Sequence, residues 1–347
     1  MQTPVPEGYW TFFADEAERG RSPLYRKIAL GIREDNELRK MAARVKPGQP
    51  QANIILAAVH YLLLDGADHP LADHYKSVRP NAKPHSEPFP LFHDFCLTHE
   101  KALLPLIESR VTNTNEVARS TSLYPAFDFV ARETQAPLHL IEIGPSAGFN
   151  MNWDRYRYAY RLGERALTRG PTHARLSLDA QMKGAHLPDL AETFPTIASR
   201  TGLELNPVDL SSAEDRLWLK ALIWPELTER FARLDAAIVT ARENPHRIVV
   251  GDALANLESA VKSLPAGGTA VVYHSHVTYQ FSEAMRTRLN TILESLTRTR
   301  PLYRVSIEFD MGAYPVNIGR YENGKSDKRA IALCDPHGSW LEWTATP

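Results

Sequence analysis

The feature that most constrains the fold of this chain is an apolar run that ends in an acid and passes directly into a turn bracketed by glycines. The run covers residues 138–143, with Glu142 near its end, and the turn runs from Gly144 to Gly148. A continuous apolar run of this length is typical of a strand buried on both faces of a parallel sheet. The first glycine lets the chain turn sharply, and the second lets backbone approach a ligand closely. The segment therefore predicts a strand-to-helix turn around a bound nucleoside.

Apolar runs continue to alternate with amphipathic segments after this turn. Helical periodicity occupies residues 218–242 and 281–298, and the strand-like runs are residues 138–143, 202–205, 247–250, 269–274 and 303–309. Such alternation predicts an α/β fold with a doubly wound, mostly parallel sheet and helices on both faces. Three more runs follow at 316–321, 330–334 and 340–343, with Asn323 and Gly324 between the first two. Because Asn-Gly between short strands is a hairpin signal, we expect an antiparallel terminal hairpin to close one edge of the sheet.

The chain before residue 138 is expected to be helical. Its apolar residues recur at helical spacing in residues 9–19, 23–30, 54–64 and 92–107. The segment 54–64 is apolar nearly all round, which predicts a buried helix. Residues 79–90 are rich in proline and without periodicity, so we expect a surface loop there.

A length of 347 residues suits two domains. We expect an all-α lobe over residues 1–130 that covers the substrate, followed by the α/β domain over residues 131–347. The interval between Gly148 and Glu204 is longer than one crossover helix requires. An insertion is therefore expected at about residues 163–199.

Composition argues against several classes of function. A net charge of -1 at pH 7 gives no electrostatic footprint for nucleic acid or an anionic membrane. Two cysteines, Cys96 and Cys334, argue against a disulfide framework and a cysteine-rich metal site. The apolar segments are too short to span a bilayer, and residues 1–6 lack the pattern of a signal peptide. We expect a cytoplasmic protein that binds a small molecule, and neither nucleic acid nor membrane.

Polar side chains also stand at the ends of the later strands. Glu204 ends the second strand, where an acid accepts hydrogen bonds from ribose hydroxyls in nucleoside-binding sheets. Asp252 and Ala253 follow the third strand, where they can meet an adenine, and His274 and His276 end the fourth. Because ligands bind at the carboxyl ends of parallel strands, these residues predict the other parts of a nucleoside site.

This succession of signals resembles the class I, Rossmann-like S-adenosylmethionine-dependent methyltransferases over residues 138–347. In that family an acid-x-Gly-x-x-x-Gly loop holds the methionine part of the cofactor, and Glu142, Gly144 and Gly148 match it. The middle glycine of the usual loop is replaced here by Ser146. The resemblance implies S-adenosylmethionine as cofactor and a methyltransferase-type domain. The cofactor-binding residues that it implies are Glu142, Gly144, Ser146, Ala147, Gly148, Glu204, Asp252 and Ala253.

Five short segments give a closer resemblance, to a bacterial family known only as a domain of unknown function. The segments together extend over nearly the whole chain, and this resemblance also implies the methyltransferase-like fold without specifying a substrate. They are residues 112–120, 154–158, 206–210, 218–225 and 335–338.

Two other interpretations of the glycine turn remain open. The turn can be purely structural. Its Gly-x-Ser-x-Gly spacing also fits a serine hydrolase with Ser146 as the nucleophile. In that case Asp252 and a later histidine would follow in the order that such enzymes use.

The two histidines after the fourth strand also have alternative roles. Their spacing predicts that His274 and His276 point to the same face of one strand. Either is a candidate general base that takes a proton from a methyl acceptor, because its unperturbed pKa lies near neutrality. They can instead be structural residues with satisfied hydrogen bonds. A metal site is not expected, because no Asp, Glu or Cys stands at a suitable spacing.

Two further polar groups are interpreted as substrate or lid residues. The first is Asn115, Glu116 and Arg119, before the first strand, and the second is Asp154 and Arg155, after the glycine turn. Glu116 and Arg119 are three residues apart on a helix and can instead pair with each other. We interpret the aromatic residues between 153 and 160 as packing residues.

These observations lead to the hypothesis of a methyltransferase that uses S-adenosylmethionine and acts on a small-molecule oxygen or nitrogen acceptor. His274 or His276 would deprotonate the acceptor. The alternatives are a non-catalytic nucleoside-binding or regulatory module on the same fold and the serine hydrolase.

Overall fold

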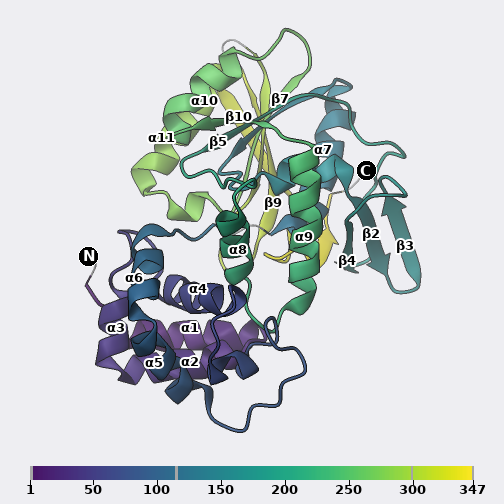
Figure 1. Ribbon diagram of the computed structural model, residues 1–347. Coiled ribbons are helices and arrows are strands. Elements are labelled where there is room, and N and C mark those ends of the chain that lie inside the picture. The colour runs from purple at the N-terminus through teal and green to yellow at the C-terminus, as the bar shows by residue number, and fades with distance from the viewer. Residues whose placement is uncertain (1–2, 114–115, 298–299, 346–347) are drawn as a thin grey trace. The chain divides into compact units, whose positions relative to one another are not determined.

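The computed structural model describes residues 3–113, 116–297 and 300–345 (Figure 1). The chain forms two compact units. The helical unit comprises Met1–Thr114 and Asp209–Asp235, and the sheet unit comprises Asn115–Val208 and Ala236–Pro347. The expected lobe boundary at residue 130 falls within helix α7 (Ser120–Thr134), which packs against strands of the sheet unit.

The helical unit is built around α4 (Gln51–Leu64), whose residues are buried nearly all round, as the sequence predicts. The expected helices are present, although residues 92–107 divide into two helices at His99. The loop expected at 79–90 ends at residue 87, because residues 88–90 begin the next helix. Trp218 donates from Nε1 to the carbonyl of Val111 at 2.9 Å and joins the same core. The other helices of this unit are α1 (Glu7–Arg19), α2 (Pro23–Glu34), α3 (Asn36–Ala42), η1 (Pro70–His74), α5 (Pro88–Thr98), α6 (Glu100–Ser109) and α8 (Ala213–Ala221). Helix α9 (Thr228–Glu243) begins in this unit and ends in the sheet unit.

Within its described residues, the sheet unit contains a mixed, mostly parallel sheet of eleven strands, which confirms the α/β class. Five neighbouring strands run parallel in the order β6, β5, β1, β7, β8. Their bounds are Arg247–Val250, Ile197–Glu204, Leu138–Ile143, Thr269–Ser275 and Leu302–Ile307. All residues of β1 and β7 are buried, because helices cover both faces of the sheet.

Packing on the two faces follows the alternation of side chains along a strand. Val272 packs in a cluster with α10 (Ala253–Lys262) and α11 (Glu283–Leu296). Tyr273, its neighbour, meets Phe127 of α7 edge to face at 5.0 Å. Figure 1 shows α10 and α11 beside each other on one side of the sheet and α7 on the other.

The expected terminal hairpin is present, but the prediction that it closes the sheet is wrong. Strands β9 (Pro315–Glu322) and β10 (Lys325–Cys334) pair antiparallel across the Asn323–Gly324 turn. The sheet then continues through β11 (Trp340–Trp343) to three strands from the interval between β1 and β5. These strands are β4 (Ser177–Lys183), β2 (Arg157–Leu162) and β3 (Arg165–Arg169). Residues from the expected insertion thus extend the sheet, because β4 pairs with β11 in parallel.

The connection that follows the glycine turn also differs from the expected crossover helix. It is a 3-10 helix of seven residues, η3 (Phe149–Arg155), which leads into β2. The aromatic residues near it are packing residues, as expected: Tyr156, Tyr158 and Tyr160 are buried. Their hydroxyls donate to the carbonyls of Phe149, Trp153 and Thr121.

Candidate functional site

The order of the parallel strands places the candidate site between β1 and β7. From β1 the chain first forms β2, β3 and β4 at the far end of the sheet, then β5 and β6 on one side of β1, and later β7 and β8 on the other side. Among the five parallel strands, the strand order therefore reverses between β1 and β7. In open α/β sheets such a reversal point opens a crevice at the carboxyl ends of the strands, where ligands bind.

Glu142 lies at this point as a buried acid. Its Oε2 accepts a hydrogen bond of 2.9 Å from the hydroxyl of Tyr273, the residue beside it in register on β7. Burial raises the pKa of Glu142 to about 8, and the nearby carboxylate of Glu204 adds to the rise, against the opposing effects of Tyr273 and Arg119. The carboxyl group is therefore mostly protonated at neutral pH. Tyr273 was absent from the sequence prediction, because only the strand register brings it to Glu142.

The glycine turn adopts the conformation that its two glycines allow. Gly144 and Gly148 have φ of +70° and +73°, in the left-handed region. Ser146, which replaces the expected middle glycine, is also left-handed, with φ +55°. A left-handed conformation costs a non-glycine residue roughly 1–2 kcal/mol, so surrounding contacts must hold Ser146 there.

Glu204 supplies these contacts. Its Oε2 accepts a hydrogen bond of 2.7 Å from the amide of Ser146, and its Oε1 accepts one of 2.9 Å from the amide of Asn206. The residue assigned to the ribose therefore binds the glycine turn directly. Each carboxylate oxygen can accept a further hydrogen bond, so contact with a ribose stays a prediction.

Glu204→Gln is expected to destabilise the sheet unit by about 1.5–3 kcal/mol, the range for loss of a buried hydrogen bond to a charged group. The amide nitrogen of glutamine cannot accept a hydrogen bond, so one of the two backbone amides loses its partner. Urea unfolding at pH 7 measures the change. Unchanged stability would show that this carboxylate does not hold the turn.

Asp252 and Ala253 lie at the start of α10. Asp252 is exposed, and its Oδ1 accepts a hydrogen bond of 2.9 Å from the amide of Ala255, which makes it the N-cap of the helix. Ala253 is the first residue of that helix. Strand β6, which precedes them, is two strands from β1, and their contact with an adenine stays a prediction.

His274 is a fully buried structural residue. Its Nδ1 lies 2.6 Å from Oε1 of Glu308, and its Nε2 accepts a hydrogen bond of 3.0 Å from Nε of Arg304. Because Arg304 only donates, the proton of the neutral ring is on Nδ1 and points to Glu308. Burial lowers the pKa of His274. Both ring nitrogens are therefore engaged, and His274 has no nitrogen left for an acceptor.

His276 does not share a strand face with His274, so that expectation is wrong. Strand β7 ends at Ser275, and His276 turns away with φ +57°. Two neighbours fix this turn: the carbonyl of Ile307 accepts from the amide of His276 at 2.9 Å, and Glu308 accepts from the next two amides. Although burial raises the pKa of Glu308, hydrogen bonds from His274 and these amides lower it to about 2.

The ring of His276 is nevertheless less constrained than that of His274. It stacks on Tyr314 at 4.8 Å, and its Nε2 is buried without a hydrogen-bond partner among the described residues. Burial, with the positive charge of Arg119, lowers its pKa to about 3. The ring is therefore neutral at physiological pH. The loop that carries it also touches the glycine turn, because a Cβ on Gly144 would lie 2.7 Å from Cγ2 of Val277.

The polar cluster before β1 is anchored to the loop at 335–338. Glu116 accepts a hydrogen bond from the amide of Ala118 at the start of η2 (Val117–Arg119), and Nε of Arg119 donates to the carbonyl of Pro336 at 2.9 Å. Both side chains are buried. Asn115 lies outside the described residues. Residues 116–119 and 335–338, which are far apart in the sequence, thus meet beside the site.

Asp154 and Arg155 are neighbours on η3, but their side chains have different environments. Asp154 pairs with Arg200 of β5 at 2.6 Å, and this pair fixes η3 against the sheet. Arg155 is exposed. A role for either residue in substrate binding stays a prediction.

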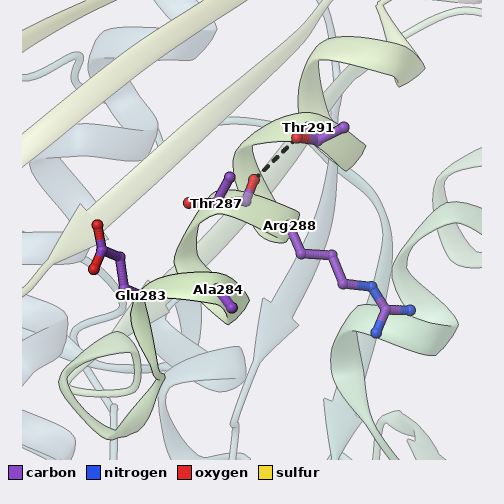
Figure 2. Close-up of a pocket in the computed structure, with 5 residues that line it drawn as sticks. All are labelled: Glu283, Ala284, Thr287, Arg288 and Thr291. Carbon is purple, nitrogen blue, oxygen red and sulfur yellow. Dashed lines mark hydrogen bonds between the residues drawn. The ribbon is translucent and has the colours of Figure 1, made fainter.

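An open surface depression lies elsewhere, along α11 (Figure 2). Glu283, Ala284, Thr287, Arg288 and Thr291 of this single helix line it, and Thr291 donates from its hydroxyl to the carbonyl of Thr287. It contains none of the strand-end residues, so it does not belong to the candidate site.

Two searches of the described residues found nothing further. No group of three or more His, Cys, Asp or Glu side chains is arranged there to hold a metal ion. In the same part of the chain, every helix is too short or too polar to cross a membrane.

Comparison with known proteins gives one match. A protein-family model matches residues 9–343, and its description is an uncharacterized protein conserved in bacteria, DUF2332. No curated protein matches the chain, and no solved structure does. The matched span includes residues of both compact units.

Proposed function

The chain belongs to the DUF2332 family of bacterial proteins, and we propose that it binds S-adenosylmethionine and transfers its methyl group to a small-molecule oxygen or nitrogen acceptor. The observation that carries this proposal is the meeting of a buried acid, a left-handed glycine turn and an unpartnered imidazole nitrogen at the β1–β7 reversal point. The resemblance of Glu142, Gly144 and Gly148 to the methyltransferase loop selects this cofactor from the nucleosides that such a crevice can hold.

Several features of the glycine turn fit this cofactor. Three left-handed residues, Gly144, Ser146 and Gly148, curve the backbone within five positions, and strain of this kind gathers at ligand-binding sites. Glu142 can offer a carboxylate to a bound ammonium once its proton has left. When bound, S-adenosylmethionine supplies an electrophilic methyl group.

The chain's own contribution to the reaction would then be mainly alignment, because an electrophilic methyl needs little activation. Glu204 holds the turn through the amide of Ser146. His276, neutral at physiological pH, can form a hydrogen bond with the acceptor through Nε2. A ring with a pKa of about 3 does not retain a proton at pH 7, so His276 would orient the acceptor while water takes the proton.

Binding of S-adenosylmethionine is expected to release about one proton and to strengthen as pH rises. An ammonium beside Glu142 favours the ionised carboxylate, whereas the unliganded group has a pKa of about 8. The association constant should therefore rise roughly tenfold per pH unit below pH 8 and level off above it. Calorimetric titration in two buffers of different ionisation enthalpy measures the proton.

Glu142→Gln is the matched variant for this titration, because glutamine keeps the shape and loses the titratable group. It should bind more weakly at pH 8 and release no proton from this site. If neither S-adenosylmethionine nor S-adenosylhomocysteine binds to the unmodified protein, the proposed function is overturned.

A non-catalytic nucleoside-binding module is the second candidate. The observation that favours it is that neither candidate histidine is suited to act as a base: His274 is engaged at both nitrogens and His276 has a low pKa. Mass spectrometry of the purified protein would identify a retained nucleoside, and methyl transfer to a cell extract would distinguish an enzyme from such a module.

The structure gives less support to the hypothesis of a serine hydrolase. Asp252 caps α10, and His274 is held by Glu308 and Arg304, so neither is available to activate Ser146.

A further inference from the structure

Large apolar side chains are exposed where β7 and β8 end. Tyr279, in η4 (Thr278–Gln280) after β7, is 60% exposed, and Phe309, just after β8, is also 60% exposed. Met311 follows in the same loop and is 99% exposed. Single exposed apolar residues are ordinary, but several beside one candidate site indicate a binding surface.

The loop after β8 holds its apolar tip rigidly. Asp310 and Ala313 exchange two backbone hydrogen bonds of 2.8 and 2.9 Å, which close a tight turn around Met311 and Gly312. Met311 has φ +47° and Gly312 has φ +88°. Turns of this type normally use Asn, Asp or Gly at both central positions. Methionine is unfavourable at this position because it adopts a left-handed conformation and exposes its apolar side chain to solvent. The stability of the fold alone therefore does not explain the presence of methionine here.

A row of rings connects this loop to the candidate site. Phe309 contacts Tyr314 at 5.4 Å between ring centroids, and Tyr314 stacks on His276 at 4.8 Å with the ring planes 15° apart. The unpartnered Nε2 of His276 lies at the inner end of this row. The row therefore leads from an exposed apolar edge to a buried polar atom.

Arg119 gives the inner end a positive charge. After burial, its guanidinium is the largest influence on the pKa of both His276 and Tyr279, which it lowers, and its effect exceeds the opposing effect of the Glu308 carboxylate. A cation favours the ionised form of an acidic group placed beside it. The inner end of the row thus suits a group that becomes an anion, and the outer end suits a flat apolar body.

We propose that the loops after β7 and β8 form an acceptor site for a flat aromatic molecule with one acidic hydroxyl, a phenol or naphthol. The ring would pack on Phe309, Met311 and Tyr279, and the hydroxyl would reach Nε2 of His276. This inference rests on the proposed function for its chemistry. The phenolic oxygen attacks the methyl carbon, the carbon–sulfur bond breaks to leave S-adenosylhomocysteine, and the phenolic proton passes to water.

The test uses 2-naphthol as the probe and the full chain without cofactor, with binding followed by fluorescence. We expect saturable binding that Phe309→Ala weakens at least tenfold. The matched control is Phe12→Ala, which removes a phenylalanine of similar exposure, 58%, from the helical unit and should change the dissociation constant less than twofold. Met311→Gly keeps the turn conformation, so it should weaken binding without lowering the melting temperature.

A second probe, 2-methylnaphthalene, tests the role of the hydroxyl. It should bind at least tenfold more weakly than 2-naphthol, and equal binding would overturn recognition of the hydroxyl. Absence of 2-naphthol binding, or equal loss in Phe309→Ala and Phe12→Ala, would overturn the acceptor site. If S-adenosylmethionine still binds in calorimetry, the failure concerns this inference alone. Naphthol binding without cofactor binding would overturn the proposed function and leave the aromatic site standing.

Discussion

Replacing Glu142 by glutamine is expected to stabilise the protein by up to about 3 kcal/mol at pH 7. In the folded protein the pKa of Glu142 is about 8, whereas its ordinary value is 4.5. At pH 7 the unfolded chain therefore carries an ionised carboxylate that folding must protonate. Each pH unit between 4.5 and 7 costs about 1.36 kcal/mol, which gives the expected gain. The carbonyl oxygen of glutamine can still accept the hydrogen bond from Tyr273.

The stabilising effect of Glu142→Gln depends on pH. A group whose pKa is raised by folding stabilises fully below its unfolded pKa, and this contribution is lost as pH rises toward the folded value. The unmodified protein should lose stability between about pH 4.5 and pH 8 relative to the variant, with little further change above. Urea unfolding at pH 5, 7 and 9 measures the difference.

Asp252→Asn is the matched control for this measurement. It also converts an acid to an amide at a strand end, but Asp252 is an exposed N-cap and asparagine caps a helix equally well. Its stability should change by less than about 0.5 kcal/mol, as for most surface substitutions. A constant difference between Glu142→Gln and the unmodified protein across pH 5 to 9 would contradict the raised pKa.

Gly338→Ala is expected to destabilise the protein by about 2–5 kcal/mol, although it adds only one methyl group. The added Cβ would lie 2.1 Å from the carbonyl oxygen of Ala118, which is backbone and cannot rotate away. Gly338 also has φ +74°, a conformation that destabilises alanine by about 1–2 kcal/mol. Overpacking against the carbonyl adds a further destabilisation of about 1–3 kcal/mol. Denaturant unfolding measures the loss.

Gly324→Ala separates the two contributions. Gly324 has the same φ, +74°, but a Cβ there meets nothing within 4 Å. It should cost only the conformational part, about 1–2 kcal/mol. Equal losses in the two variants would mean that the contact between residues 335–338 and η2 is not tight, and the anchoring of Arg119 beside the site would have to be reconsidered.

Much of the sheet could be predicted from the sequence because its signals are local. The strands at residues 138–143, 247–250 and 340–343 have the expected bounds, since each is a short apolar or aromatic run bounded by turn residues. The Asn323–Gly324 hairpin follows from a two-residue turn signal. The expected burial of α4 follows from a segment without a polar face.

The remainder depends on pairings between distant residues. Nothing in residues 177–183 identifies residues 340–343 as their partner, so the continuation of the sheet beyond the hairpin was missed. The engagement of His274 depends in the same way on Glu308 and Arg304, which follow it by about thirty positions. The sequence locates the carboxyl ends of the five parallel strands to within two residues. Which side chains hold the backbone there, as Glu204 and Glu308 do, depends on the tertiary structure.

The position of β11 sets the order in which the sheet can be assembled during synthesis. This strand of four residues lies between β10 and β4 and joins the strands β4, β2 and β3 to the rest of the sheet. Strand β4 is synthesised about 160 residues before its neighbour β11, so one edge of β4 stays unpaired until residue 343 has been made. Because unpaired edges associate with other chains, the nascent protein is prone to aggregation at this edge until β11 has been made.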